Sequence, residues 1–295
     1  MPQCGCRGFL FQPPSLFPLY IHSAASAAAA ASAAASVPPC ERTFVIDVPT
    51  ANDAARPAKR AKTTAPKAAA ALSITVEQGW HARVHELGTA VWESSAVTLR
   101  WLEQHRDLVA GKSVLELGAG PGLIAIACAA LGAERVVCSD NNADVLALAR
   151  RNVARSVADG IIAPSAVRVV EYCWGAADAA ALGGGKWDLI IGADIMYLPT
   201  LYAEIAAEVH ALLRPRTGVV LLVATLRGVA LPEALVQRIV DDDDASGGEE
   251  LGLEATWHDA APFVARCTET RPETWERWAP KGIAMCTLAH AEVAS

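Results

Sequence analysis

The stretch VLELGAGPGLIAIACAALGA, residues 114–133, joins an apolar run of strand length, three closely spaced glycines and an apolar run of helix length. Glycine permits a positive φ and lets a ligand approach the backbone closely. The start of the helix that follows presents N–H groups without intrahelical partners. A strand, a glycine turn and a helix in this order predict the first unit of a nucleotide-binding α/β domain. The stretch is not a phosphate-binding P-loop, because Gly111-Lys112-Ser113 precedes the strand.

Strand-length and helix-length apolar segments alternate along the chain after residue 72, as βαβ units require. We predict helices at 123–131, 143–153, 201–213 and 232–240, and strands at 113–117, 135–139, 167–171, 187–191, 218–225, 253–257 and 283–288. The first five strands should be parallel, with helices on both faces. The expected fold is therefore α/β, a doubly wound, mostly parallel sheet of seven strands.

The composition changes near residue 72, which predicts two regions. Residues 1–72 are interpreted as a disordered Ala/Ser/Pro-rich leader followed by a basic linker, and residues 73–295 as one folded domain. Residues 1–40 contain one Arg and no acid, which suits either an organellar transit peptide or an Ala-biased leader. The run RPAKRAKTTAPK at 56–67 is either a nuclear address or a solvated linker. A cytoplasmic location is expected, with organellar and nuclear targeting left open.

Charge limits the partners of the predicted domain. Of 25 basic and 32 acidic side chains, the first 72 residues hold seven and three, which leaves 18 and 29 and a net charge of −11. An acidic domain argues against nucleic acid as the principal partner and suits a basic, lysine-bearing protein. No uninterrupted apolar run reaches the ~18 residues that a membrane span needs, so no membrane contact is expected.

Neither a metal site nor a disulfide framework is expected. The chain has no CxxC pair, and its eight cysteines stand at positions 4, 6, 40, 128, 138, 173, 267 and 286. The acidic run DDDDASGGEE at 241–250 lacks the ligand spacing of a calcium loop and is interpreted as a flexible loop.

The second predicted strand ends at Asp140, 22 residues after Gly118. This is close to the ~20-residue spacing at which an acid meets a cofactor ribose. A nicotinamide dinucleotide and S-adenosylmethionine both carry such a ribose. The glycines and Asp140 therefore do not choose between the two cofactors.

Several segments resemble the seven-β-strand protein-lysine methyltransferases of the methyltransferase-like group, a class I, Rossmann-like family. Upstream of the glycine turn, GTAVWE is similar to the family's Gly-x-x-Val-Trp-(Asp/Glu) helix, which implies that Trp92 packs on the cofactor. The strand and turn LELGAG match the family's Leu-Glu-Leu-Gly-x-Gly, which implies contacts from Glu116, Gly118 and Gly120. In this resemblance Glu116 meets the amino group of the methionine moiety. Its alternative role is that of a structural acid at the strand end.

The likeness continues through two further segments. EYCWG resembles the segment whose tryptophan lines the adenine pocket, which implies this role for Trp174. WDLIIGADIMY matches the family signature Asp-x-x-Tyr, which implies catalytic positions for Asp194 and Tyr197 and places Ala193 beside the cofactor. Beyond residue 226 the likeness fades. Trp275 and Trp278 are either substrate contacts or packing residues.

The implied activity is S-adenosylmethionine-dependent transfer of a methyl group to a lysine of a protein substrate, by a monomer. Asp194 would orient the amine, and Tyr197 would wall the pocket with its π face. Three alternatives remain: a methyltransferase of the same fold acting on a small molecule or another side chain, a non-catalytic scaffold, and a nicotinamide dehydrogenase. A dehydrogenase is disfavoured because no second catalytic constellation stands out, and a scaffold because the cofactor residues are present.

Overall fold

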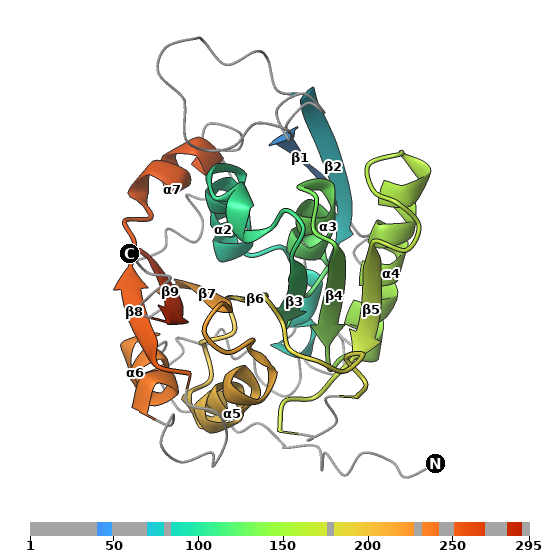
Figure 1. Cartoon of the computed structure of the whole chain (residues 1–295). Helices are drawn as coiled ribbons and strands as arrows, with labels where there is room; N and C mark the ends of the chain where they lie inside the picture. Colours follow the sequence, from blue (N-terminus) through green and yellow to red (C-terminus); the bar gives the residue numbers. More distant parts are fainter. Residues whose placement is uncertain are drawn as a thin grey trace, which may run out of the picture. The chain divides into compact units, whose positions relative to one another are not determined.

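The computed structural model describes residues 40–48, 70–79, 84–175, 180–226, 232–241, 251–268 and 282–290. Its main sheet has seven strands in the order β5-β4-β3-β6-β7-β9-β8 (Figure 1). The strands are β3 (Ser113–Leu117), β4 (Arg135–Asp140), β5 (Val167–Glu171), β6 (Leu189–Ala193), β7 (Val219–Thr225), β8 (Leu253–Trp257) and β9 (Ile283–His290). Strands β3 to β7 are parallel, and β9 is antiparallel to both β7 and β8. The predicted fold class is confirmed.

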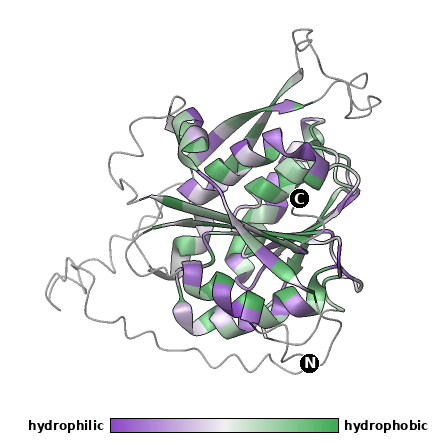
Figure 2. Ribbon diagram, turned by 60° about the vertical axis from the view of Figure 1, so that its left-hand side comes forward, coloured by the Kyte–Doolittle hydropathy of each residue, from purple (hydrophilic) through white to green (hydrophobic). Residues whose placement is uncertain are grey.

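Helices cover both faces of this sheet. The helices are α2 (Glu93–Gln104), α3 (Leu123–Ala130), α4 (Ala143–Ala158), α5 (Tyr202–Leu212), α6 (Pro232–Asp241) and α7 (Ala261–Thr268). Alternate residues of β3 separate the two cores: Val114 packs with α2, α3, α4 and α7, whereas Leu115 and Leu117 pack with α5 and α6. In Figure 2 the largely apolar strands lie between the two layers of helices. None of the described helices has the length and apolar character needed to cross a membrane.

The predicted elements agree closely with the observed ones. Every predicted strand overlaps an observed strand, with bounds that differ by at most two residues. Trp187, predicted to begin a strand, instead makes an isolated bridge to Leu213 at the end of α5. Helix α4 runs five residues further than predicted, because Ser156 is buried and the first helix-stopping glycine with positive φ is Gly160.

The boundary predicted at residue 72 is wrong for part of the leader. Strands β1 (Cys40–Val48) and β2 (Ala70–Gln78) form an antiparallel hairpin. On β1, Phe44 and Ile46 are buried, and alternate residues of β2 face the same core. The RTFVIDV segment that forms most of β1 alternates correctly for a strand, but the Ala-rich sequence around it hid the signal. Residues 1–39 and 49–69, the predicted acidic loop from residue 242 onward, Trp275 and Trp278 lie outside the described residues.

Candidate functional site

The glycine turn lies at the carboxyl end of β3, beside the point where the strand order reverses between β3 and β6. Gly118, Gly120 and Gly122 have φ values of 63°, 56° and 84°, which confirms the need for glycine. A Cβ added to Gly118 would stand 2.8 Å from Cγ2 of Ile195 and 3.3 Å from Cζ2 of Trp174. The glycine turn is therefore closely packed, and the ring of Trp174 lies directly against it.

Trp174 is positioned from helix α5. The buried carboxylate of Glu208 accepts a hydrogen bond from the Tyr172 hydroxyl at 2.5 Å and another from the Gly175 N–H at 2.8 Å. The two bonds fix the chain on either side of Trp174. The sequence analysis did not identify Glu208 and Tyr172 as site residues. The one signal in the sequence was Glu208 itself, an acid among the apolar positions of a predicted helix.

The segment preceding α2 forms a second wall of the turn. A Cβ added to Gly120 would stand 3.0 Å from the carbonyl oxygen of Gly88, so this backbone lies directly against the turn. Trp92 is the half-buried N-cap of α2, and its Nε1 donates to the Leu87 carbonyl at 3.1 Å. The 88–92 segment therefore lies beside the glycine turn, and the contact of Trp92 with the cofactor stays a prediction.

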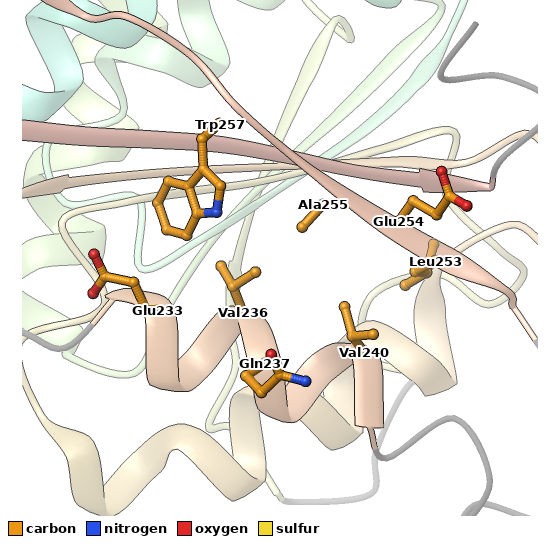
Figure 3. A pocket seen from close by; sticks show the side chains of 8 residues that line it. All are labelled: Glu233, Val236, Gln237, Val240, Leu253, Glu254, Ala255 and Trp257. Atoms are coloured by element: carbon orange, nitrogen blue, oxygen red, sulfur yellow. The ribbon is translucent and has the colours of Figure 1, made fainter.

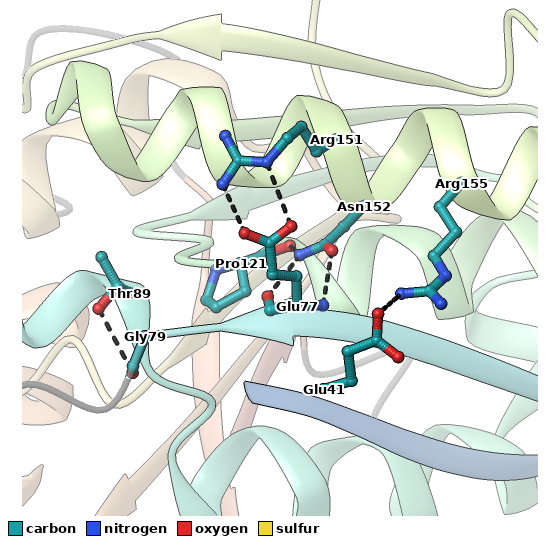
Figure 4. A network of polar contacts seen from close by, with 8 residues as sticks. All are labelled: Glu41, Glu77, Gly79, Thr89, Pro121, Arg151, Asn152 and Arg155. Carbon is teal, nitrogen blue, oxygen red and sulfur yellow. Dashed lines mark hydrogen bonds and ion pairs between the residues drawn. The ribbon is translucent and has the colours of Figure 1, made fainter. Parts of the chain in front are cut away.

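The hairpin strand β2 is tied to both parts of the site (Figure 4). Asn152 of α4 is buried; its Nδ2 donates to the carbonyls of Glu77 and Pro121, each at 2.9 Å, and its Oδ1 accepts from the Glu77 N–H at 2.7 Å. The side chain of the next residue, Gln78, accepts from the Val91 N–H at 2.9 Å. Strand β2 is therefore hydrogen-bonded directly to the segment that carries Trp92, and through Asn152 to the glycine turn. No local sequence motif marks Asn152 or Gln78.

Asp140 ends β4 beside the turn, where the spacing predicted it. Its Oδ2 accepts from the Gly120 N–H at 3.2 Å, and its Oδ1 accepts from the Asn142 N–H at 3.1 Å. Burial raises the pKa of this carboxyl. A carboxylate offers about four acceptor positions, so capacity remains for hydroxyl groups of a ribose.

Glu116 faces the interior below the turn. Its Oε2 accepts from the Ala125 N–H in the first turn of α3 at 2.8 Å, and only 3% of the residue is exposed. Burial, only partly offset by this hydrogen bond, raises the pKa of the carboxyl to about 8. The structural role that the sequence left open is therefore present, since Glu116 joins β3 to α3. Its contact with a methionine amino group stays a prediction.

Stability should consequently depend on pH through Glu116. Between about pH 4.5 and 8 the folded protein holds a proton that the unfolded chain has lost, so the free energy of unfolding falls as pH rises through this window. Glu116→Gln removes the titration. We expect the variant to gain stability relative to wild type as pH rises from 5 to 8, measured by urea unfolding at each pH. Parallel stability curves for the two proteins would contradict the assignment.

Asp194 links the carboxyl ends of β6 and β7. It has a φ of 62°, which is strained for a residue other than glycine, and it is buried. Its Oδ1 accepts from the Thr225 N–H at 2.9 Å, its Oδ2 accepts from the Thr225 hydroxyl at 3.1 Å, and its own N–H donates to the Val223 carbonyl at 2.8 Å. Thr225 is a site residue that sequence reasoning missed.

Tyr197 follows Asp194 by three residues and has 45% of its surface exposed. Partial burial raises the pKa of its phenol, and the carboxylates of Asp140 and Asp194 raise it further. Asp140, which is distant in sequence, is thus close enough to Tyr197 to interact with it electrostatically, as the neighbouring Asp194 does. Ala193, the last residue of β6, is partly buried beside them. The gathered carboxylates make an electronegative site that suits a cationic ligand better than a phosphate.

Comparison with known proteins shows which family the chain belongs to. A profile described as lysine methyltransferase matches residues 71–230, more than half of the chain. The chain belongs to this lysine methyltransferase family. The match confirms the predicted resemblance, and it contains all nine site residues predicted from the sequence.

Individual relatives match this member of the family over part of their length. The chain is 33% identical to protein N-lysine methyltransferase METTL21A of Mus musculus, over 52% of its own length and 67% of that protein. It is also 33% identical to protein N-terminal and lysine N-methyltransferase EFM7 of Yarrowia lipolytica over 43% of this chain, a match that spans only about half, 53%, of that protein. Among solved structures, a ribosomal protein L11 methylase of Lactobacillus delbrueckii aligns with a TM-score of 0.45 and 16% identity over 68% of this chain and 81% of that chain.

Proposed function

We propose that the protein is an S-adenosylmethionine-dependent protein-lysine N-methyltransferase. The observation that carries the proposal is the pair Asp194 and Tyr197, which follows β6 at the carboxyl edge of the sheet beside Asp140 and the glycine turn. In a doubly wound sheet this edge is where ligands bind. The family match and the electronegative character of the site support the same activity.

The residues around the turn fit the cofactor. Gly118 and Gly120 let the turn pack closely against Trp174 and the segment before Trp92, and Asp140 has acceptor capacity for the ribose. Glu116 and Ala193 complete the proposed contacts. When bound, S-adenosylmethionine supplies an electrophilic methyl group on a sulfonium.

The remaining residues act on the substrate amine. Methyl transfer is an in-line displacement, so catalysis depends on placing a neutral amine on the axis of the breaking bond and excluding water. Asp194, held rigidly by Thr225, orients the amine, and Tyr197 offers a π face to it. The lysine must lose its proton before transfer, because only the neutral amine carries the lone pair that attacks the methyl group.

The exposure of Tyr197 favours a protein substrate over a small molecule, because a lysine presented from a protein surface can reach a solvent-exposed residue. A second candidate is another protein amine, since the printed name of the Yarrowia relative includes a protein N-terminus. Mapping the methylated residue distinguishes the two.

The deciding experiment is transfer of radiolabelled methyl from S-adenosylmethionine into cell extract by the full chain, with mass-spectrometric mapping of any labelled protein. We expect label on a lysine. Label on an N-terminal amine would support the second candidate. Label confined to small molecules, or absent despite cofactor binding, would overturn the proposal.

Cofactor binding is tested separately through Asp140. Asp140→Ala should weaken the affinity for S-adenosylmethionine by about 1.5 to 3 kcal/mol, as expected when hydrogen bonds to a charged acceptor are lost. Asp140→Asn is the matched variant, because it keeps an acceptor for the Gly120 N–H. Unchanged calorimetric affinity in both variants would refute the ribose assignment.

We further propose a monomer that resides in the cytoplasm and binds no nucleic acid. The acidic balance of residues 73–295 supports the last point. Light scattering of the purified chain and localisation of a fluorescent fusion, with and without residues 1–39, test the first two.

A further inference from the structure

A cavity of about 470 Å³ lies between helix α6 and strand β8 (Figure 3). Val236 and Val240 of α6 line one side of it, and Leu253 and Ala255 of β8 line the other. Trp257 lies at one end of this groove, and Figure 3 shows its indole ring on the same side as the Glu233 carboxylate. The family profile ends at residue 230, so the groove belongs to a part of the chain that the profile does not cover.

Trp257 lies at the same edge of the sheet as the proposed active site. Because β9 is antiparallel to both of its neighbours, β8 runs in the same direction as β6 and β7. Trp257 is therefore at the carboxyl end of β8, as Asp194 is at that of β6. Tyr197 and Trp257, each 45% exposed, are the two aromatic residues among the exposed large hydrophobic side chains of the described chain. Both thus face solvent at one edge.

The chemistry of the groove suits a basic side chain. A carboxylate and an indole at one end attract an ammonium or guanidinium group, the indole through its π face. The apolar sides of the groove accommodate the methylene stem of Lys or Arg. Glu233 lies in the first turn of α6 and is exposed, so its carboxylate can be reached from solvent.

We propose that this groove receives a Lys or Arg side chain of the protein substrate, a few residues from the lysine that is methylated. The proposal rests on the proposed function. Strand β8 is three places from β6 in the sheet, which corresponds to about 14 Å, and an extended peptide covers that distance in roughly four to five residues. The substrate class is therefore a protein segment with two basic residues at about this spacing.

The test is the rate of methyl transfer as a function of the amount of the protein that wild type labels in extract. We expect Trp257→Ala and Glu233→Lys to raise the apparent KM about 5- to 10-fold while leaving kcat and cofactor affinity unchanged. The Glu233→Lys effect should shrink at high KCl, because salt screens exposed charges. Trp257→Phe, which retains a π face, should recover most of the loss.

Glu134→Lys is the matched control for charge, because Glu134 is exposed at the amino end of β4, on the opposite edge of the sheet. If wild type labels a protein and both groove variants keep its KM, the groove has no role in recognition. An equal rise of KM in Glu134→Lys would show that the net charge of the protein, and not the position of Glu233 in the groove, governs substrate binding. That result would also overturn the proposal. Failure of wild type to label any protein would instead overturn the proposed function.

Discussion

Replacing Asp194 by Asn should reduce methyl transfer at least about 100-fold while leaving the folded structure and cofactor affinity nearly unchanged. The amide oxygen of Asn can still accept from the Thr225 N–H, and its NH2 group can donate to the Thr225 hydroxyl. Asn also tolerates the positive φ at this position. The substitution therefore removes the negative charge that orients the amine and little else.

Asp194→Ala is the less informative variant. It leaves the Thr225 N–H buried without its partner, which costs about 1 to 3 kcal/mol of folding free energy. A loss of activity measured only in Asp194→Ala could therefore come from a less stable fold as well as from the lost carboxylate. Rates from single-turnover transfer, melting temperatures and calorimetric cofactor affinity should be compared for wild type, Asn and Ala. Undiminished turnover in Asp194→Asn would remove the charge of Asp194 from the mechanism.

Adding one methyl group at the glycine turn should have the largest effect on cofactor binding. In Gly118→Ala the new Cβ would lie 2.8 Å from Ile195 and 3.3 Å from Trp174, in a backbone with φ of 63°. The backbone strain costs about 1 to 2 kcal/mol, and the overpacking costs about 1 to 3 kcal/mol more. Displacement of Trp174 should lower the affinity for S-adenosylmethionine at least about 10-fold.

Gly111→Ala separates strain from overpacking. Gly111 has a similar φ of 69°, but a Cβ there would meet nothing within 4 Å. We expect this control to lose only the strain energy in urea unfolding and to bind the cofactor like wild type. Equal losses of stability and affinity in the two variants would show that contact with Trp174 and Ile195 is unimportant.

Local patterns predicted much of the fold because they need no distant partner. Strand-length apolar runs, the helix α4 that Asn142 caps and the positive-φ glycines depend on residues close in sequence. The position of Asp140 beside Gly120 also followed from spacing, since adjacent parallel strands end at the same edge.

Other features depend on residues that are distant in sequence. Asn152 contacts Glu77 and Pro121, 75 and 31 positions away, and nothing near Asn152 indicates either contact. Thr225 holds Asp194 from 31 positions away. The hairpin of β1 and β2 was missed because an Ala-rich segment separates its two strands, and its buried side chains find their partners in helices that are distant in sequence.

The sequence by itself determined the seven strands of the main sheet, the helices α3 to α6, the glycine turn, the acid beside it and the Asp-x-x-Tyr signature, because each is encoded within one segment. Only the tertiary structure decided that Glu116 is buried against α3, that Trp174 packs on Gly118, and that Trp257 and Glu233 share a groove. The physical reason is that burial and close contact are properties of segments brought together by packing, which no single segment specifies.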